Sequence, residues 1–146
     1  MIPPDETAEV LVVRRVLSVA RERVFDAWLD AASLARWMRP GDTTDAVVEV
    51  DPRVGGRFRI DMRHGHAGNE HWGEYLAIEP PSLLSFTWHS AQTDHRPTVV
   101  TVELLASGGG TELILTHRRL PPGRVDAHRK GWTDIVRALE AVLASG

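Results

Sequence analysis

The amino-acid sequence predicts an α+β domain in which a seven-stranded, curved antiparallel sheet wraps around one long C-terminal helix. Three observations predict this fold. From residue 44 onward, apolar residues recur at every second position in runs separated by turn residues. Every clear strand is apolar on a single face, so the sheet has one dry face that needs a cover. Residues 120–144 carry an apolar stripe at helical spacing, which supplies that cover.

The first strand is predicted over residues 9–19, a run rich in Val and Leu. Its two faces are similar, and we favour as the inner one the row Val13, Arg15, Leu17 and Val19. The period then changes to that of a helix. Two short helices are predicted before Pro40 and Gly41 end the helical region. The first carries Val24, Phe25, Trp28 and Leu29 on one side, and the second brings together Leu34 and Trp37.

Six further strands are predicted after residue 44. Five of them have one clear apolar row. These rows are Ala46, Val48 and Val50; Phe58, Ile60 and Met62; Leu84, Phe86 and Trp88; Val100, Val102 and Leu104; and Leu113, Leu115 and His117. The strand over residues 71–79 does not keep one parity, because Trp72 and Tyr75 are both large and fall on opposite sides. We expect Gly73 to mark a β-bulge that resolves this conflict.

The C-terminal helix is predicted to begin near Pro121 and Pro122, which are tolerated only in a first turn. Its apolar stripe follows three- and four-residue steps. The stripe consists of His128, Gly131, Trp132, Ile135, Val136, Leu139, Val142 and Leu143. An isolated helix cannot keep such a stripe dry, so we expect it to pack against the inner face of the sheet.

The composition limits the function. A chain of 146 residues suits one domain, predicted over residues 9–146 after a flexible lead-in over residues 1–8. A net charge of −3 argues against a general nucleic-acid binder, and the absence of cysteine excludes thiol catalysis. No signal peptide or membrane-length apolar run is present, so we expect a cytoplasmic protein without membrane insertion, either monomer or homodimer. No Gly-rich phosphate loop is recognisable, and no cofactor is expected.

Five segments in order carry a family resemblance. They are ERVFDAWLD with LARWM, DPRVGGRFRI, GEYLAIEPPSLLSFTW, THRRLPP, and the final HRKGW run with its spaced leucines. Over residues 10–144 the sequence resembles the START-like (SRPBCC, Bet v 1-like) superfamily of helix-grip folds, and within it the branch of activator of heat-shock protein 90 ATPase homologues. Ala20 stands where the family usually has proline. The resemblance implies a cavity between the sheet and the C-terminal helix.

The resemblance leaves three functions open, because one fold hosts many activities. The first is binding of a hydrophobic or aromatic small molecule in the cavity. The second is a cyclase- or hydrolase-type reaction, with His117, His128 or Glu74 as acid or base. The third is a protein-binding module related to the chaperone activators, although this chain lacks the separate N-terminal domain of the eukaryotic co-chaperones.

We favour small-molecule binding, because an aromatic lining suits a flat apolar ligand. The predicted ligand-binding residues are Trp37, Phe58, Met62, Trp72, Phe86, Trp88, His117, His128, Trp132, Ile135 and Leu139. Gly131 is a further signal, since glycine inside a helix costs roughly 1 kcal/mol relative to alanine. It either opens space for a ligand or admits a bulky strand residue, and the sequence does not separate the two.

Other polar groups carry weaker hypotheses. His117 and His128 can meet near the cavity mouth, and Arg15 can pair with a ligand carboxylate or with Glu74. His64, His66 and His71 have a metal-like spacing, but they lie in a predicted hairpin loop that fixes no ligand geometry, so no metal site is predicted. The outward row Arg57, Arg59 and Arg63 fits a solvated sheet face.

Overall fold

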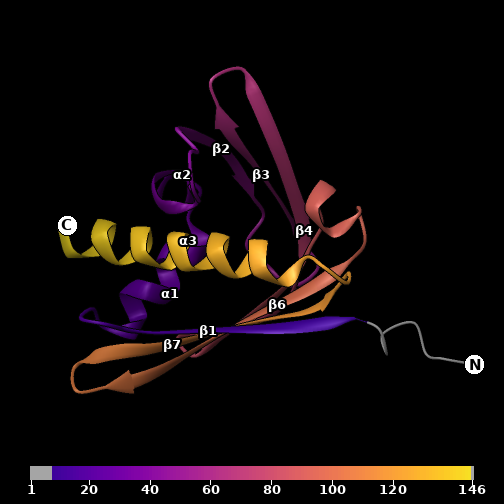
Figure 1. Cartoon of the computed structure of the whole chain (residues 1–146). Coiled ribbons are helices and arrows are strands. Elements are labelled where there is room, and N and C mark those ends of the chain that lie inside the picture. The colour runs from indigo at the N-terminus through magenta and orange to yellow at the C-terminus, as the bar shows by residue number, and fades with distance from the viewer. Residues whose placement is uncertain (1–7, 146) are drawn as a thin grey trace, which may run out of the picture.

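The computed structural model describes residues 8–145. The elements follow one another as β1 (Glu9–Leu17), α1 (Arg21–Leu29), α2 (Ala31–Trp37), β2 (Asp45–Val50), β3 (Arg57–His64), β4 (Ala67–Glu79), β5 (Leu83–Trp88), the 3₁₀ turn η1 (Ala91–Thr93), β6 (Thr98–Ser107), β7 (Gly110–Leu120) and α3 (Val125–Ser145) (Figure 1). This is the predicted element order. Of the predicted lead-in, residues 1–7 lie outside the described residues.

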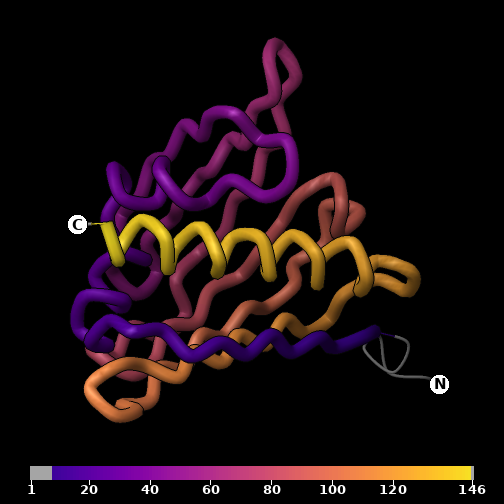
Figure 2. The backbone as a smooth tube through the Cα atoms, turned by 60° about the vertical axis from the view of Figure 1, so that its left-hand side comes forward, coloured from indigo at the N-terminus to yellow at the C-terminus, as the bar shows by residue number. Residues whose placement is uncertain are grey.

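The seven strands form one antiparallel sheet in the order β1-β7-β6-β5-β4-β3-β2. Each strand after β2 pairs with the strand that precedes it in the chain, and β7 finally pairs with β1. The sheet curves around α3, which crosses its concave side (Figure 2). The predicted fold class is confirmed. No helix between residues 8 and 145 is long and apolar enough to cross a membrane.

The inner face of β1 is the predicted one. Leu11, Val13 and Leu17 are buried, whereas Val12 and Val16 on the alternate positions are exposed. Arg15 also lies on the inner side, but its partner differs from the expected Glu74. Its Nη2 atom lies 2.7 Å from Glu140 Oε1 of α3, because Glu74 belongs to β4, which three other strands separate from β1.

The C-terminal helix begins later than predicted. Pro121 and Pro122 form part of a turn, and α3 begins at Val125. The reason is Gly123, whose φ of +85° is incompatible with a right-handed helix. The backbone N–H of Arg124 donates to the carbonyl of Pro121 at 3.2 Å, which closes the turn.

The bulge in β4 also differs from the prediction. The register with β5 shifts between Tyr75 and Ala77, so Leu76 is the extra residue. Gly73 serves another purpose, since a Cβ atom there would overlap the carbonyl of Thr87 and the ring of Phe58. Glycine therefore lets β4 and β5 approach closely. With the bulge at Leu76, Tyr75 is buried on the inner face and Trp72 lies on the outer face.

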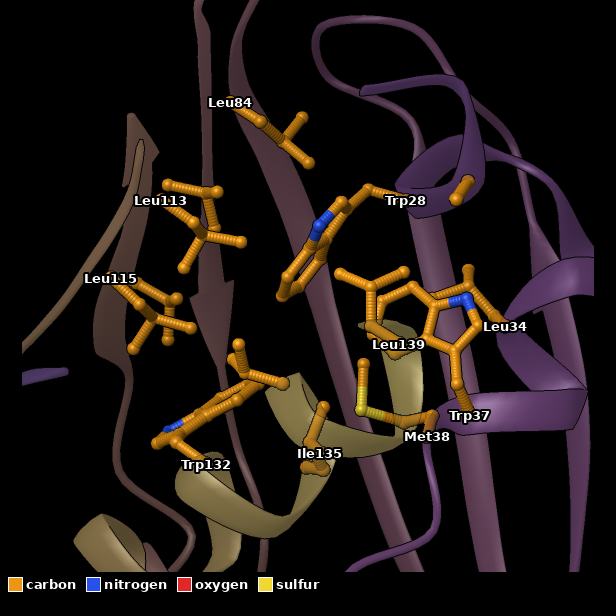
Figure 3. Packing of buried hydrophobic residues seen from close by; sticks show 14 of the residues in the cluster. Trp28, Leu34, Trp37, Met38, Leu84, Leu113, Leu115, Trp132, Ile135 and Leu139 are labelled. Carbon is orange, nitrogen blue, oxygen red and sulfur yellow. The ribbon is translucent and has the colours of Figure 1, made fainter. Parts of the chain in front are cut away.

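The main core lies between the C-terminal half of α3, the sheet, and α1 and α2. Trp28 of α1 and Trp37 of α2 meet edge to face, with ring centroids 4.7 Å apart. Figure 3 shows both rings directed toward Leu139, beside Leu34 and Met38. Trp37 and Leu139 are fully buried. This half of the helix interface is closely packed.

Candidate functional site

A pocket of about 260 Å³ lies between the N-terminal half of α3 and the opposite strands. Its wall on the sheet side comes from β3, β4 and β5, and η1 and the loop after α2 form its rim. The apolar lining consists of Pro40, Met62, Trp88, Ala127, Trp132 and Ile135. The polar lining consists of Asn69, His71, Gln92, His128, Lys130 and Asp134, and Gly41 and Gly131 complete the wall.

The pocket brings together five of the predicted ligand-binding residues: Met62, Trp88, His128, Trp132 and Ile135. They come from β3, β5 and α3, which the alternating pattern and the helical stripe had placed face to face. The rings of Trp88 and Trp132 lie 4.9 Å apart and form one aromatic side of the pocket. Gly131 lies between His128 and Trp132 on the same wall.

Phe58 and Phe86 do not line this pocket. Together with Trp88 and Trp28 they border a neighbouring space of about 10 Å³, which holds roughly one water-sized probe. The Phe58 and Phe86 rings meet at 87° with centroids 5.3 Å apart. Their role in the structure is core packing.

The predictions for Trp37, Leu139 and Trp72 require correction. Trp37 and Leu139 lie in the packed core beside α1 and α2. Trp72 lies on the outer face of the sheet, where its ring stacks on His89 with centroids 3.8 Å apart. The parity change at Leu76 explains the error for Trp72, because it places His71 and Tyr75 inward instead.

His117 meets His128, as expected, with ring centroids 5.1 Å apart. However, His117 is fully buried, and both of its ring nitrogens are used within the protein. Its Nδ1 atom accepts from Trp132 Nε1–H at 3.0 Å, so Nε2 carries the hydrogen and donates to Thr98 Oγ1 at 2.7 Å. The Thr98 hydroxyl in turn donates to the carbonyl of Trp88 at 2.6 Å.

This network has a structural role. Burial, the largest cause, and the neighbouring His128 lower the pKa of His117 to about 3. The ring is therefore neutral at physiological pH, and it holds the Trp132 indole against the sheet. With both ring nitrogens engaged, His117 has no free position for a ligand or for proton transfer. The acid–base pair expected for a cyclase or hydrolase is not assembled from His117 and His128.

Of the pocket residues that the ligand-site prediction missed, His71 is the buried one. It is 5% exposed, its ring packs against Trp88 with centroids 4.7 Å apart, and its Nδ1 lies 3.0 Å from the carbonyl oxygen of Asn69. His71 has the same parity as Gly73 and Tyr75, so a correct position for the bulge would have placed it inward. The structure separates it from His64 and His66, which are exposed at the hairpin turn.

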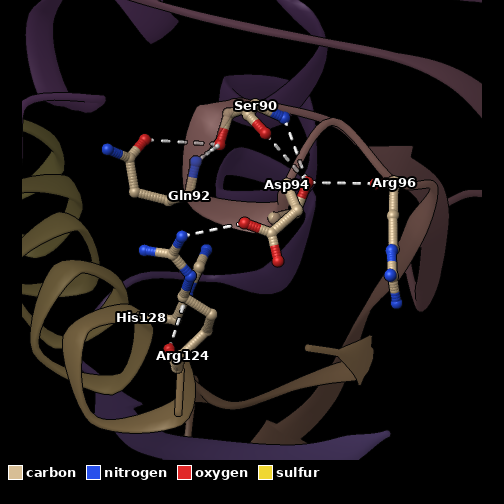
Figure 4. Close-up of polar contacts among 7 residues, drawn as sticks. Ser90, Gln92, Asp94, Arg96, Arg124 and His128 are labelled. Atoms are coloured by element: carbon tan, nitrogen blue, oxygen red, sulfur yellow. Dashed lines mark hydrogen bonds and ion pairs between the residues drawn. The ribbon is translucent and has the colours of Figure 1, made fainter. Parts of the chain in front are cut away.

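Two ion pairs fix the elements around the mouth of the pocket. Arg124 Nη2 at the start of α3 lies 2.8 Å from Asp94 Oδ1, next to η1 (Figure 4). Asp94 adopts a left-handed conformation after η1, and Ser90 caps η1 through its side chain. On the other side of the mouth, Asp134 accepts from Lys130 Nζ at 3.0 Å and from the backbone N–H of Gly41 at 3.1 Å. The hydrogen bond from Lys130 is the largest cause that lowers the pKa of Asp134.

Comparison with known proteins places this architecture in a family. The family model described as "Activator of Hsp90 ATPase homolog 1-like protein" matches residues 18–144. The chain belongs to this family. The resemblance seen in the sequence motifs is thereby confirmed. No match was found among curated proteins.

Solved structures of similar fold agree with this family assignment. A Chromobacterium violaceum protein is 25% identical with a TM-score of 0.79, covering 92% of this chain and 96% of that one. A Rhodobacter sphaeroides protein is 25% identical with a TM-score of 0.79, covering 94% and 93%. An HSP90 activator from Plasmodium falciparum is 25% identical with a TM-score of 0.76, covering 92% and 96%.

Proposed function

We propose that this protein binds a hydrophobic or aromatic small molecule in the pocket between the sheet and the N-terminal half of α3. The observation that carries the proposal is Gly131. A Cβ atom at this position would meet only the Cβ of Pro40, at 3.8 Å, which is an ordinary contact. No strand residue packs against the glycine, so packing does not require it there.

Packing does not require Gly131, so the stability that the helix loses at this glycine has no structural benefit. Glycine in the interior of a helix destabilises it by roughly 1 kcal/mol relative to alanine. Because Gly131 lines the pocket, its missing side chain enlarges the space beside Trp132. A ligand that fills this space gives the glycine a function.

The size and lining of the pocket define the ligand class. A cavity of roughly 150 Å³ is enough to hold benzene, so about 260 Å³ suits one or two aromatic rings. Trp88 and Trp132 offer ring faces and edges, and Met62 adds a flexible apolar contact.

The outer face of the sheet gives less support to a protein-binding role or a nucleic-acid partner. Trp72 and Leu76 are exposed there, and charged side chains lie beside Trp72. Arg59 pairs with Glu70 at 2.7 Å, and the Arg57 guanidinium lies 6.0 Å from the centroid of the Trp72 ring. A face on which charged side chains of both signs lie among the apolar ones fits a solvated surface.

An NMR titration with naphthalene tests the proposal. The wild-type protein should show saturable shifts, and Gly131→Leu should weaken binding at least about tenfold, because the new side chain occupies the pocket. The matched control is Ala141→Leu, which adds the same side chain to an exposed position of α3 and should leave the affinity unchanged. Absence of saturable binding, or equal affinity in Gly131→Leu, would contradict the proposal.

A further inference from the structure

The pocket contains two buried imidazoles from different elements, His71 of β4 and His128 of α3. Each ring places its Nδ1 atom against a backbone carbonyl. His71 Nδ1 lies 3.0 Å from the oxygen of Asn69, and His128 Nδ1 lies 2.8 Å from the oxygen of Arg124. A carbonyl oxygen accepts and never donates, so the hydrogen must sit on Nδ1 in both rings.

Both rings are neutral near physiological pH. Burial is the largest cause that lowers the pKa of His71, to about 4, and it outweighs the backbone hydrogen bonds and Asp61, which act in the opposite direction. Burial also lowers the pKa of His128, and the positive charge of Arg124 acts in the same direction. In a neutral ring with its hydrogen on Nδ1, the Nε2 atom is a hydrogen-bond acceptor.

These two acceptors have no partner of their own. Within residues 8–145, neither Nε2 atom makes a hydrogen bond of good geometry, although the His71 ring also lies near the backbone carbonyl of Ile60. Of the buried side-chain polar atoms in that range, Trp28 Nε1 alone is both fully enclosed and without a partner. The two Nε2 atoms therefore contact open space, and the open space beside these two rings is the pocket.

The amide and ammonium donors of the pocket lie farther out, whereas the indole N–H of Trp88 is a buried donor that makes no hydrogen bond within residues 8–145. Gln92 and Lys130 are exposed at the mouth and Asn69 is half-buried, whereas His71 and His128 are 5% and 9% exposed. Lys130 is moreover paired with Asp134. A ligand group at the buried end meets two imidazole lone pairs and one indole N–H, and a hydroxyl, which both donates and accepts, satisfies both kinds of group. A carboxylate there would lose its hydration and face two acceptors with the Trp88 indole N–H as the buried donor.

We propose that the pocket selects neutral aromatic ligands that carry a hydrogen-bond donor, such as a phenolic O–H or a ring N–H, over carboxylates of the same shape. This selection rests on the proposed function, because it concerns the same pocket. The apolar walls provide the affinity for the ring, and the two imidazoles determine which substituent is accepted.

Four probes of one shape test the selection by NMR titration: naphthalene, 2-naphthol, 2-methoxynaphthalene and 2-naphthoate. At pH 7.5, 2-naphthol should bind about three- to tenfold tighter than 2-methoxynaphthalene, which keeps the oxygen and loses the donor. The 2-naphthoate anion should bind weakest. His128→Phe or His71→Phe should remove the preference for 2-naphthol while naphthalene still binds. The matched control, His66→Phe at the exposed hairpin turn, should keep the preference.

The outcomes separate the two proposals. Equal affinity for 2-naphthol and 2-methoxynaphthalene, or tighter binding of 2-naphthoate, would overturn donor selection while naphthalene binding still supports the pocket. A preference for 2-naphthol that survives in both His→Phe variants would overturn the role of the imidazoles. If no probe binds, the proposed function fails as well.

Discussion

The two halves of α3 use the same apolar stripe for different purposes. The C-terminal half, around Leu139, is covered by Trp28 and Trp37 and leaves almost no space. The N-terminal half, around Gly131, faces a pocket of about 260 Å³. Helix α1 contacts the C-terminal end, where Arg23 Nη2 donates to the carbonyl of Leu143 at 3.1 Å. The apolar stripe of α3 alone does not decide where the core ends and the pocket begins. The positions of α1 and α2, which cover the C-terminal half of the helix, decide it.

The largest effect on stability is expected in the C-terminal half of α3, the closed half, which Trp28 and Trp37 cover. Trp37→Ala should lower the free energy of unfolding by about 3–5 kcal/mol, because it opens a cavity beside Trp28 and Leu139 and removes the bond from Trp37 Nε1 to Ser33 Oγ. Urea denaturation measures the change. The matched control is Trp72→Ala on the outer face, where the side chain is 39% exposed and stacks on His89, and its cost should be at most about 2 kcal/mol. Equal costs would contradict the assignment of the core.

The next largest effect is a dependence of stability on pH. It is expected at the boundary between the two halves of α3, where His117 holds Trp132. The folded pKa values of His117 and His71 are lowered to about 3 and about 4, whereas an unfolded histidine titrates near 6.5. The unfolded state therefore binds more protons below pH 6.5, and stability should fall as pH falls from about 6.5 toward 4. Each buried histidine contributes up to about 1.4 kcal/mol per pH unit.

Urea denaturation at pH 6 and pH 5 tests this acid sensitivity. His117→Gln keeps one donor and one acceptor but does not titrate, so its stability should fall less steeply with pH than that of the wild type. His66→Gln at the exposed turn is the control, and it should keep the wild-type slope. Parallel curves for wild type and His117→Gln would show that His117 is not held neutral.

A smaller effect on stability, of opposite sign, is expected in the N-terminal half of α3, the open half, which faces the pocket. Gly131→Ala should raise the free energy of unfolding by about 1 kcal/mol, since alanine favours the helix and its Cβ fits at 3.8 Å from Pro40. Thermal and urea denaturation both report the change. A loss of stability would mean that the glycine is required by packing, which would remove the main argument for the pocket.

The smallest effect is expected at the edge of the sheet. The pair between Arg15 and Glu140 is partly exposed, with 35% and 27% of the side chains accessible. Arg15→Met should therefore lower stability by less than about 1 kcal/mol, with the difference shrinking further in high salt. A salt-independent loss of several kcal/mol would instead indicate a buried structural role.

The sequence predicts the architecture well because its two hydrophobic periods, the alternation in the strands and the helical stripe on α3, are both regular. Alternation along β3, β5, β6 and β7 fixes the inner face, and the stripe on α3 fixes what packs against it. The errors arise where a single residue changes the local conformation. Leu76 shifts the parity of β4 and thereby exchanges Trp72 for His71 on the inner face. Gly123 ends the turn that contains Pro121 and Pro122, so α3 begins later.

The candidate site was predictable only in part. Periodicity places Met62, Trp88, Trp132 and Ile135 on facing surfaces, and these residues do line the pocket. Periodicity does not show where along α3 the cover ends, because that depends on the positions of α1, α2 and η1 in space. Leu139 therefore looked equivalent to Trp132 in sequence, although one lies in the core and the other beside the pocket.

The contrast between the two halves can be measured directly with two methionines. Met62 lines the pocket, whereas Met38 is 1% exposed in the closed half beside Trp37. In a protein labelled at the methionine methyl groups, titration with 2-naphthol should shift the Met62 signal saturably and leave the Met38 signal nearly unchanged. Equal shifts of both signals, or no shift of Met62 at saturating ligand, would contradict an open N-terminal half and a closed C-terminal half.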